Sequence, residues 1–327
     1  MYHLSLPFRH EPRVSFYLAV EEYVAREKRC DEGLFFTWQT GPSVIFGRNQ
    51  DARREVNVDY CRQHGVATYR RKSGGGCVYA DMGNLMLSYV APGDHVQFIY
   101  HQYTTMMVGA LRQMGIAAEA SGRNDLLVGG GKVSGTAYYQ LPGRAIVHGT
   151  LLYDTDMEHM THCLTPDDAK LSSKGVKSVS QRIALLKDHT ALTLTEIRDG
   201  LTDFLCRDTI ALSDDDLKSI LRIEQTYRDE SFLWGKPATA DKVVRSGRLE
   251  GVGTLEVSMD ISDGRIGDIS LAGDFLATGN IGELCRQLTG LQTSRDDIIG
   301  RLPADLSHYI AGLTAESLAS LLAEDYR

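Results

Sequence analysis

The chain has 327 residues, which is enough for one large domain and a second, smaller one. With 43% hydrophobic and 24% charged residues, its composition is that of a globular protein, and the net charge of -8 argues against nucleic-acid binding. The sequence has no apolar run of about 20 residues and no basic-then-apolar start, so we expect a soluble, cytoplasmic protein without a membrane segment.

The first predicted element is a buried amphipathic helix within residues 15–29, with Ser15 available as its N-cap. Its apolar face holds Phe16, Ala19, Val20, Tyr23 and Val24. Short apolar or alternating runs separated by turn residues follow, and they predict strands that pair largely with their neighbours in sequence. These runs are 33–40, 43–49, 66–73, 76–81 and 84–91.

The middle of the chain predicts a helix that ends at Gly115, followed by strand-like segments on both sides of a glycine cluster at residues 129–135. Strands interrupted by helices, without regular βαβ alternation, indicate an α+β (mixed α/β) fold with mixed sheets flanked by helices.

Residues 156–164 predict a short helix, and residues 165–182 form a polar, Lys- and Ser-rich stretch without periodicity. A loop of this length inside a compact domain is usually functional or mobile. Two helices follow, the second capped by Asp214–Asp216. A hairpin that turns at Asp263 and Gly264 and three further helices then predict a small second domain. We therefore expect a large domain at 1–243 and a small second domain at 244–327.

Residues 70–76 read RRKSGGG, with two arginines and a lysine directly before a serine and three glycines. The spacing is neither that of a P-loop nor that of a dinucleotide-binding G-x-G-x-x-G motif. Glycines allow close backbone approach and expose N–H groups, and an arginine fork matches phosphate or carboxylate oxygens. The stretch suits a nucleoside phosphate, and the alternative is a glycine-rich turn with solvated basic residues.

A second cluster places Lys132 among glycines and a serine, where its ammonium could approach a phosphate or carboxylate. Together the motifs resemble those of the lipoate-protein ligase A family, within the superfamily of lipoate ligases, octanoyltransferases and biotin ligases. The resemblance spans most of residues 14–182, and the C-terminal segment resembles the accessory domain of two-domain members. It rests on RRKSGGGCVYADMGNL, SGRNDLLV, GGGKVSGTAYY, HGTLLYDTDM and KLSSKGVKSV, in that order.

The resemblance implies that Arg70, and chiefly Arg71, line the nucleotide pocket. Lys132 would be catalytic, reaching both the activated carboxyl group and the α-phosphate. Further ATP or adenylate contacts would come from Ser73, Gly74, Gly75, Gly76, Cys77, Val78, Tyr79, Asn124 and Asp125. The lipoate site would include Lys132, His148 and Gly75. The adenylate-binding loop would contribute Lys170, Lys174 and Ser178.

The family's reaction predicts ATP with Mg²⁺ and lipoate as the small-molecule requirements, with metal ligands that the sequence does not identify. It predicts lipoyl domains of 2-oxoacid dehydrogenase E2 subunits, or glycine-cleavage H protein, as partners. We expect no nucleic-acid or membrane partner. The chain departs from the family at Ala80, where a histidine is usual, and at Val147, where a first histidine often precedes His148.

Two other functions fit parts of the pattern. An octanoyltransferase would take its acyl group from a carrier protein without ATP and would depend on a cysteine or a lysine. Cys163 is the tempting nucleophile, although its helical spacing is more typical of a core residue. A non-catalytic lipoate-binding paralogue would keep the pocket and lack turnover. The cysteines show no Cys-x-x-Cys pair and are expected to be free thiols: Cys30, Cys61, Cys77, Cys163, Cys206 and Cys285.

Overall fold

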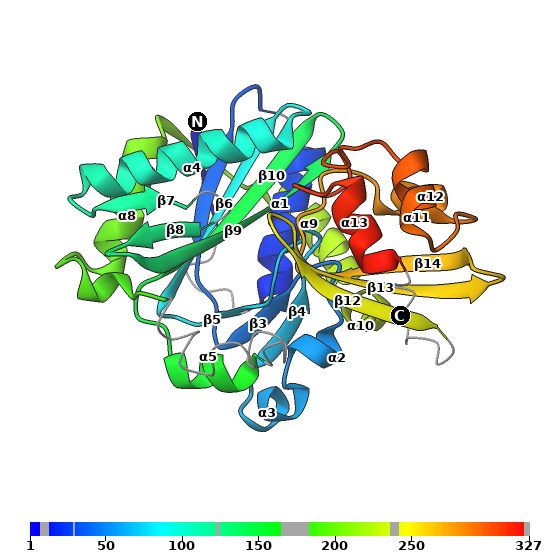
Figure 1. Ribbon diagram of the computed structural model, residues 1–327. Helices are drawn as coiled ribbons and strands as arrows, with labels where there is room; N and C mark the ends of the chain where they lie inside the picture. The colour runs from blue at the N-terminus through cyan, green and yellow to red at the C-terminus, as the bar shows by residue number, and fades with distance from the viewer. Residues whose placement is uncertain (7–12, 29, 122–124, 165–182, 236–241, 324–327) are drawn as a thin grey trace. The chain divides into compact units, whose positions relative to one another are not determined.

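The structure is a computed structural model that describes residues 1–6, 13–28, 30–121, 125–164, 183–235 and 242–323. It separates into two compact units (Figure 1). The first consists of Met1–Phe46, Ala52–Arg71 and Cys77–Leu233. The second consists of Gly47–Asp51, Lys72–Gly76 and Trp234–Arg327. Two short segments from the first quarter of the chain therefore belong with the C-terminal unit.

The first unit is built around an eight-stranded mixed sheet, and the fold class is α+β as expected from the sequence. The strand order is β11-β1-β2-β6-β10-β9-β8-β7. These strands are β1 (Tyr2–Ser5), β2 (Leu34–Trp38), β6 (Asn84–Pro92), β7 (Ala118–Ala120), β8 (Asp125–Val128), β9 (Gly131–Leu141), β10 (Arg144–Leu152) and β11 (Asp208–Ala211). β1 pairs in parallel with both β11 and β2, and the other pairs are antiparallel.

A second, three-stranded sheet in this unit has the order β4-β3-β5. Its strands are β3 (Ser43–Phe46), β4 (Ala67–Arg70) and β5 (Val78–Ala80). The prediction of pairing between neighbours in sequence is therefore correct only in part: all five N-terminal strand runs form strands, but the chain distributes them over two sheets. Two short helices that the sequence analysis did not predict lie between β3 and β4, α2 (Ala52–Glu55) and α3 (Val58–Gln63).

Helices cover both faces of the large sheet (Figure 1). α1 (Val14–Arg26) packs on the face that carries Phe36, Met86 and Ile146. α4 (Val96–Gln113) packs on the opposite face, where the ring of its Tyr103 stacks on Tyr89. The remaining helices of this unit are α5 (Met157–Cys163), the 3-10 helix η1 (Leu186–Asp188), α8 (Leu194–Leu205), α9 (Asp214–Arg228) and α10 (Glu230–Trp234).

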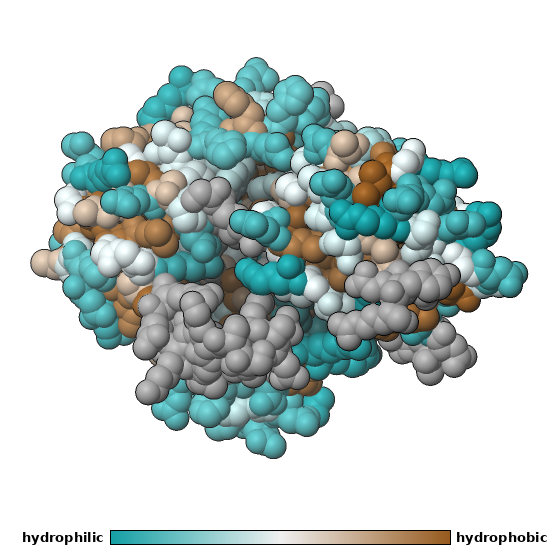
Figure 2. Space-filling model, viewed as in Figure 1, coloured by the Kyte–Doolittle hydropathy of each residue, from teal (hydrophilic) through white to brown (hydrophobic). Residues whose placement is uncertain are grey.

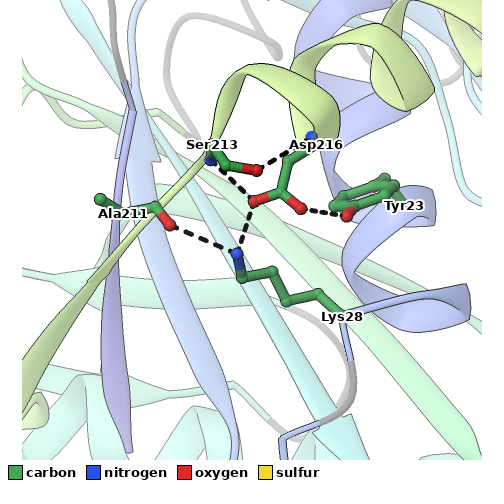
Figure 3. A network of polar contacts seen from close by, with 5 residues as sticks. All are labelled: Tyr23, Lys28, Ala211, Ser213 and Asp216. Carbon is green, nitrogen blue, oxygen red and sulfur yellow. Dashed lines mark hydrogen bonds and ion pairs between the residues drawn. The ribbon is translucent and has the colours of Figure 1, made fainter.

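α1 is buried almost all round because α9 covers the side that faces away from the sheet. Figure 3 shows the polar contacts at one end of this helix pair, where Asp216 accepts a hydrogen bond from Tyr23 and lies 2.6 Å from the ammonium of Lys28. The predicted aspartates Asp214–Asp216 lie in the first turn of α9, but the N-cap is Ser213, whose hydroxyl accepts from the N–H of Asp216. Ser15 is not the N-cap of α1: the cap position is Arg13, and the Ser15 hydroxyl donates to Glu224 of α9.

The second unit has its own core between a three-stranded antiparallel sheet and three helices. The predicted turn is present, with positive φ at Asp263 and Gly264 between β13 and β14. The elements are β12 (Val243–Leu249), β13 (Gly253–Ser262), β14 (Arg265–Gly273), α11 (Ile281–Leu288), α12 (Arg295–Arg301) and α13 (Ala315–Leu322). The sequence analysis did not predict β12.

On the face seen in Figure 2, hydrophilic residues predominate and apolar residues form separate small groups. The large apolar side chains that are exposed among the described residues are Met82, Phe98, Phe204, Leu221, Val243 and Val244. In the part of the chain that the structure describes, no helix combines the length and apolar character needed to cross a membrane.

Candidate active site

Arg70 and Arg71 lie at the end of β4, beside the edge of the small sheet. The Arg70 guanidinium lies 4.7 Å from the centre of the Phe46 ring, and its Nε donates to the carbonyl of Leu233. Arg71 is buried, and its Nη1 donates to the carbonyl of Ile45 at 2.9 Å. Burial lowers the pKa of Arg71 to about 10, so the guanidinium remains charged near neutral pH. A buried cation of this kind is suited to binding a phosphate or carboxylate.

The glycine triplet belongs to the second unit, together with Ser73. The N–H of Gly75 donates to the carbonyl of Phe275 at 3.0 Å, and Gly75 has a φ of 85°. A Cβ on Gly74 would lie 2.4 Å from the same carbonyl oxygen. In this structure the close backbone approach that Gly74 permits is made by Phe275. The predicted contacts of Gly74, Gly75 and Gly76 with a nucleotide remain a prediction.

Cys77 directly precedes β5, which contains Val78 and Tyr79 and pairs antiparallel with β3. Burial raises the pKa of Tyr79, so its hydroxyl stays protonated. The side chain of Asp81 stabilises the turn that follows. Asp81 accepts hydrogen bonds from the backbone N–H groups of Gly83 and Asp156. A cavity of about 470 Å³ adjoins this turn, lined by Pro42, Asp81, Met82, Gly83, Asp154, Thr155 and Asp156.

Lys132 lies at a β-bulge between β8 and β9. Asp125 pairs with Gly135 and Leu126 with Ser134, and the register then shifts by one residue so that Leu127 pairs with Lys132. In a regular strand, residues three apart point to opposite faces. The bulge instead directs the Lys132 side chain to the face that carries Gly135 and Asp125. Its Nζ lies 2.7 Å from Asp125 Oδ1.

Two glycines make room for this arrangement. A Cβ on Gly135 would lie 3.2 Å from Lys132 Nζ, and a Cβ on Gly131 would lie 2.6 Å from the Cβ of Ala184. The carbonyl of Lys132 accepts a hydrogen bond from Ala184 at 2.9 Å, and Lys132 forms a parallel bridge with Ile183. The backbone of Lys132 is therefore held by β8 on one side and by the bridge to Ile183 on the other, while its ammonium remains partly exposed.

His148 lies on β10, opposite Ser88 of β6 and Ala137 of β9. Its Nδ1 is 2.9 Å from Oε2 of Glu21, a fully buried residue of α1. Ser88 donates to Glu21 Oε1 at 2.6 Å and accepts from Trp38 Nε1 at 3.0 Å. Because the Trp38 N–H can only donate, the chain of hydrogen bonds runs from Trp38 through Ser88 to Glu21. Glu21 thereby fixes the orientation of the His148 ring.

Lys132 and His148 face the same side of the sheet. Thr136 pairs with Gly149, so Gly135 and Ala137 lie on the face of His148. From strand geometry, the backbone positions of Gly135 and His148 are roughly 8 Å apart. The face thus presents a cation beside Gly135 and a polar, hydrogen-bonded cluster at His148 on the neighbouring strand.

The sequence analysis missed Glu21, Ser88 and Trp38. The available signal was weak: Glu21 and Glu22 stand together in a helix whose other positions from 16 to 25 are apolar, which is unusual for carboxylates without partners. Glu21 was therefore detectable as an anomaly, but its partners lie 67 and 127 residues away in sequence. Among the predicted site residues, Asn124, Lys170, Lys174 and Ser178 lie outside the described residues.

Cys163 has the environment of a core residue. It is fully buried at the end of α5, and its thiol is hydrogen-bonded with that of Cys61. Burial raises the pKa of Cys163 to about 12, so the thiol is protonated at neutral pH. A nucleophilic cysteine requires the thiolate and access to the substrate. The geometry therefore favours the core interpretation over a catalytic one.

Family models and known proteins with similar sequences all point to one family. The model of the lipoyl protein ligase A/B catalytic domain matches residues 13–205, and that of the bacterial lipoate protein ligase C-terminus matches residues 240–322. Lipoate-protein ligase LplJ of Bacillus subtilis is 31% identical over 324 residues, covering 96% of this chain and 97% of its own. A lipoate–protein ligase of Streptococcus pyogenes is 32% identical, covering 98% of this chain and 99% of its own.

Solved structures support the same fold. P. falciparum LipL1 in complex with lipoate superposes with a TM-score of 0.74 at 20% identity and covers 92% of this chain and 94% of its own. An archaeal bipartite lipoate protein ligase from Thermoplasma acidophilum, studied with its E2 lipoyl domain, gives 0.65 at 25% identity, covering 73% of this chain and 98% of its own. The chain therefore belongs to the lipoate-protein ligase A/B family, with both domains of the two-domain type, and is a ligase.

Proposed function

We propose that the protein activates lipoate with ATP and then transfers the lipoyl group to a lysine of an acceptor protein. One observation carries this proposal. A β-bulge turns the ammonium of Lys132 to the sheet face on which the Glu21–His148 cluster lies. A carboxylic acid that spans this face would place its carboxylate at Lys132 and its ring end near His148.

In the first step, a lipoate carboxylate oxygen attacks the α-phosphorus of ATP, and the bond from that phosphorus to the bridging oxygen breaks to release pyrophosphate. The step brings two anions together, so the site has to neutralise both and hold them in line. Lys132 would contact the carboxylate and the α-phosphate, and Arg71 would provide a second, buried positive charge. The other predicted nucleotide contacts, from Arg70 to Tyr79 and at Asn124 and Asp125, are part of this proposal.

The described residues contain no group of three His, Cys, Asp or Glu side chains placed to hold a metal ion. Mg²⁺ commonly binds through one or two carboxylates, water and substrate phosphates, so a magnesium ion that arrives with ATP does not require such a group. When bound, it would supply positive charge to the departing pyrophosphate.

In the second step, a neutral amine attacks the acyl carbonyl, the bond from the carbonyl carbon to the phosphate oxygen breaks, and AMP leaves. We propose as acceptors the lipoyl domains of 2-oxoacid dehydrogenase E2 subunits or glycine-cleavage H protein. An archaeal relative has been studied with its E2 lipoyl domain, which supports the first of these.

We further propose that residues 1–243 are the catalytic domain and residues 244–327 the accessory domain. Lys170, Lys174 and Ser178 would be parts of an adenylate-binding loop. The site of action would be the cytoplasm.

An octanoyltransferase that uses a carrier-bound acyl donor is the second candidate. The burial and raised pKa of Cys163 weigh against a cysteine-dependent version of it. A paralogue that binds lipoate without turnover would share the site described above. Both candidates differ from the proposal in one measurable respect, because neither releases pyrophosphate from ATP when lipoate is added.

The test is lipoate-dependent pyrophosphate release by the purified protein with ATP and Mg²⁺. Lys132→Ala should reduce the rate by about 100-fold or more, since it removes the charge that neutralises both anions. Lys187→Ala is the matched control, because Lys187 is also paired with an aspartate, Asp154, at 2.5 Å. Absence of release from folded wild-type protein would reject the proposal, and release from Lys132→Ala at the wild-type rate would reject the role of Lys132.

A further inference from the structure

The ion pair between Lys132 and Asp125 is short but poorly aligned. The two charged atoms lie 2.7 Å apart, yet Asp125 Oδ1 is buried and makes no aligned hydrogen bond with any residue that the structure describes. Aligned, charge-assisted hydrogen bonds are the strong ones, so this pair is held mainly by charge. The partner of Asp125 is therefore exchangeable.

The first step of the reaction takes Lys132 away from Asp125. The lipoate carboxylate and the α-phosphate both need the single positive charge of Lys132, and they compete for it with Asp125. Once Lys132 has turned to the substrate, the Asp125 carboxylate is left as a third anion beside the acyl-phosphate bond. A new cation at Asp125 would restore the charge balance, and the acceptor lysine is the cation that the second step has to bring to this place.

We propose that Asp125 docks the ammonium group of the acceptor lysine, taking it as a counter-ion in exchange for Lys132. This inference rests on the two-step reaction proposed above and assigns to Asp125 a role beyond a nucleotide contact. The docked nitrogen lies one ion-pair distance from Asp125 and so within reach of the carbonyl carbon that Lys132 holds.

The neighbouring carboxylates are less suited to this role. Asp154 is paired with Lys187, and the oxygens of Asp81 are held by backbone N–H groups. Glu21 is fully buried and hydrogen-bonded to His148. Asp154 is the more exposed of the two aspartates, at 52% against 29% for Asp125, but it accepts an aligned hydrogen bond from Lys187, which Asp125 Oδ1 does not receive from Lys132. The exposed part of Asp125 lets a lysine on a folded partner reach it from solvent.

Asp125 is also held firmly enough to position a partner. Its backbone N–H donates to the Ser121 hydroxyl at 3.1 Å, and its carbonyl accepts from the Ser121 N–H at 2.8 Å. It is the first residue of β8 and pairs with Gly135, which leaves space beside its carboxylate.

The proton balance of the transfer is simple. The docked ammonium first loses one proton to solvent and becomes the nucleophilic amine. The nitrogen lone pair forms the C–N bond while the carbon–oxygen bond to phosphate breaks, and the electron pair leaves with AMP. The second nitrogen proton passes to the departing phosphate oxygen, which gives a neutral amide. Asp125 orients the ammonium and remains a deprotonated carboxylate throughout.

Asp125→Asn tests the proposal, because it keeps the shape and removes the charge. Synthetic lipoyl-AMP is supplied to the enzyme so that the transfer step is measured without the activation step. Two acceptors are compared in single turnovers. The first is a purified lipoyl domain, whose lysine carries an ammonium group, and the second is hydroxylamine, which is uncharged at pH 7.5. Asp154→Asn is the matched control, as it removes a different ion-paired aspartate of the same unit.

We expect Asp125→Asn to slow transfer to the lipoyl domain by about 30-fold or more and the hydroxylamine reaction by no more than about threefold, since only the first acceptor is charged. Asp154→Asn should leave both rates within about twofold of wild type. Equal losses with both acceptors, or a normal rate with the lipoyl domain, would overturn the proposal. Formation of lipoyl-AMP from ATP and lipoate by the wild-type protein is measured in a separate assay. Failure in that assay would reject the proposed function itself.

Discussion

A single methyl group at residue 135 should displace the ammonium of Lys132. In Gly135→Ala, the added Cβ would lie 3.2 Å from Lys132 Nζ and 3.3 Å from its Cε. Ordinary contacts between non-bonded heavy atoms are about 3.5–4.0 Å. The Lys132 side chain therefore has to move by several tenths of an ångström, away from the position at which it meets Asp125.

The size of the effect follows from how steeply catalysis depends on position. A misplacement of about 1 Å can cost 100-fold in rate, so the smaller shift at Lys132 should reduce pyrophosphate release by about 10-fold or more. The fold should not suffer, because Gly135 has no positive φ and a strand alanine is favoured over glycine by about 0.5–1 kcal/mol. Single-turnover pyrophosphate release and urea unfolding of the same preparation measure the two quantities.

Gly41→Ala is the matched control, since a Cβ at Gly41 would meet no atom within 4 Å. It should keep wild-type activity and stability. Full activity of Gly135→Ala would refute the reasoning, because it would show that a methyl group beside Lys132 does not disturb the ammonium as it turns from Asp125 to the substrate. A loss of activity that merely follows a loss of folded protein would refute it as well.

Three further predictions concern groups around the site. Cys163→Ala should keep the rate of ligation within about twofold of wild type. The wild-type thiol should resist alkylation at pH 8, because burial raises its pKa to about 12. Loss of activity in a folded variant would contradict the core assignment. Glu21→Leu should lower the free energy of unfolding by about 2–5 kcal/mol, since it removes the buried acceptor of the Ser88 hydroxyl and the His148 ring. Glu21→Gln should lower the free energy of unfolding by a smaller amount. Equal unfolding midpoints for the two variants would count against the network. Burial would raise the pKa of Asp216, but the hydrogen bonds from Lys28 and Tyr23 outweigh this and hold the pKa below its ordinary value. The stabilisation by Asp216 is therefore present above about pH 4, its unfolded pKa, and is lost as the pH falls below it. Unfolding curves of Lys28→Met should depend less on pH in that range than those of the wild type, and identical pH profiles would contradict the assignment.

Features governed by local chemistry were predictable from the sequence. Asp263 and Gly264 form the expected hairpin turn because both adopt positive φ at low cost. The three aspartates begin α9 as expected, and Asp216 forms a capping box with the N-cap Ser213, which the sequence analysis did not name. Gly115 follows the end of α4 with a φ of 80°. In each case the residues that decide the structure are close neighbours in the chain.

Features that depend on distant partners were not predictable. Ser15 has the residue type of an N-cap, but its hydroxyl is used by Glu224, 209 residues away. The bulge that turns Lys132 exists only through the pairing of β8 with β9, and no residue pattern marks it in advance. Glu21 acquires its meaning only when the sheet brings Ser88 and His148 to α1. The resemblance to the ligase family drew attention to Lys132 and His148, and the structure shows that the two residues share one face of the sheet.

The most direct test of the account is to follow acyl transfer onto a purified lipoyl domain by intact mass. The protein is incubated with the domain, Mg²⁺ and lipoate, with or without ATP, and in parallel with an octanoyl-loaded carrier protein as the only acyl source. The account predicts one lipoyl group on one lysine of the domain, formed only with ATP and lost in Lys132→Ala. Modification from the carrier without ATP, or no modification by folded protein under any of these conditions, would contradict it.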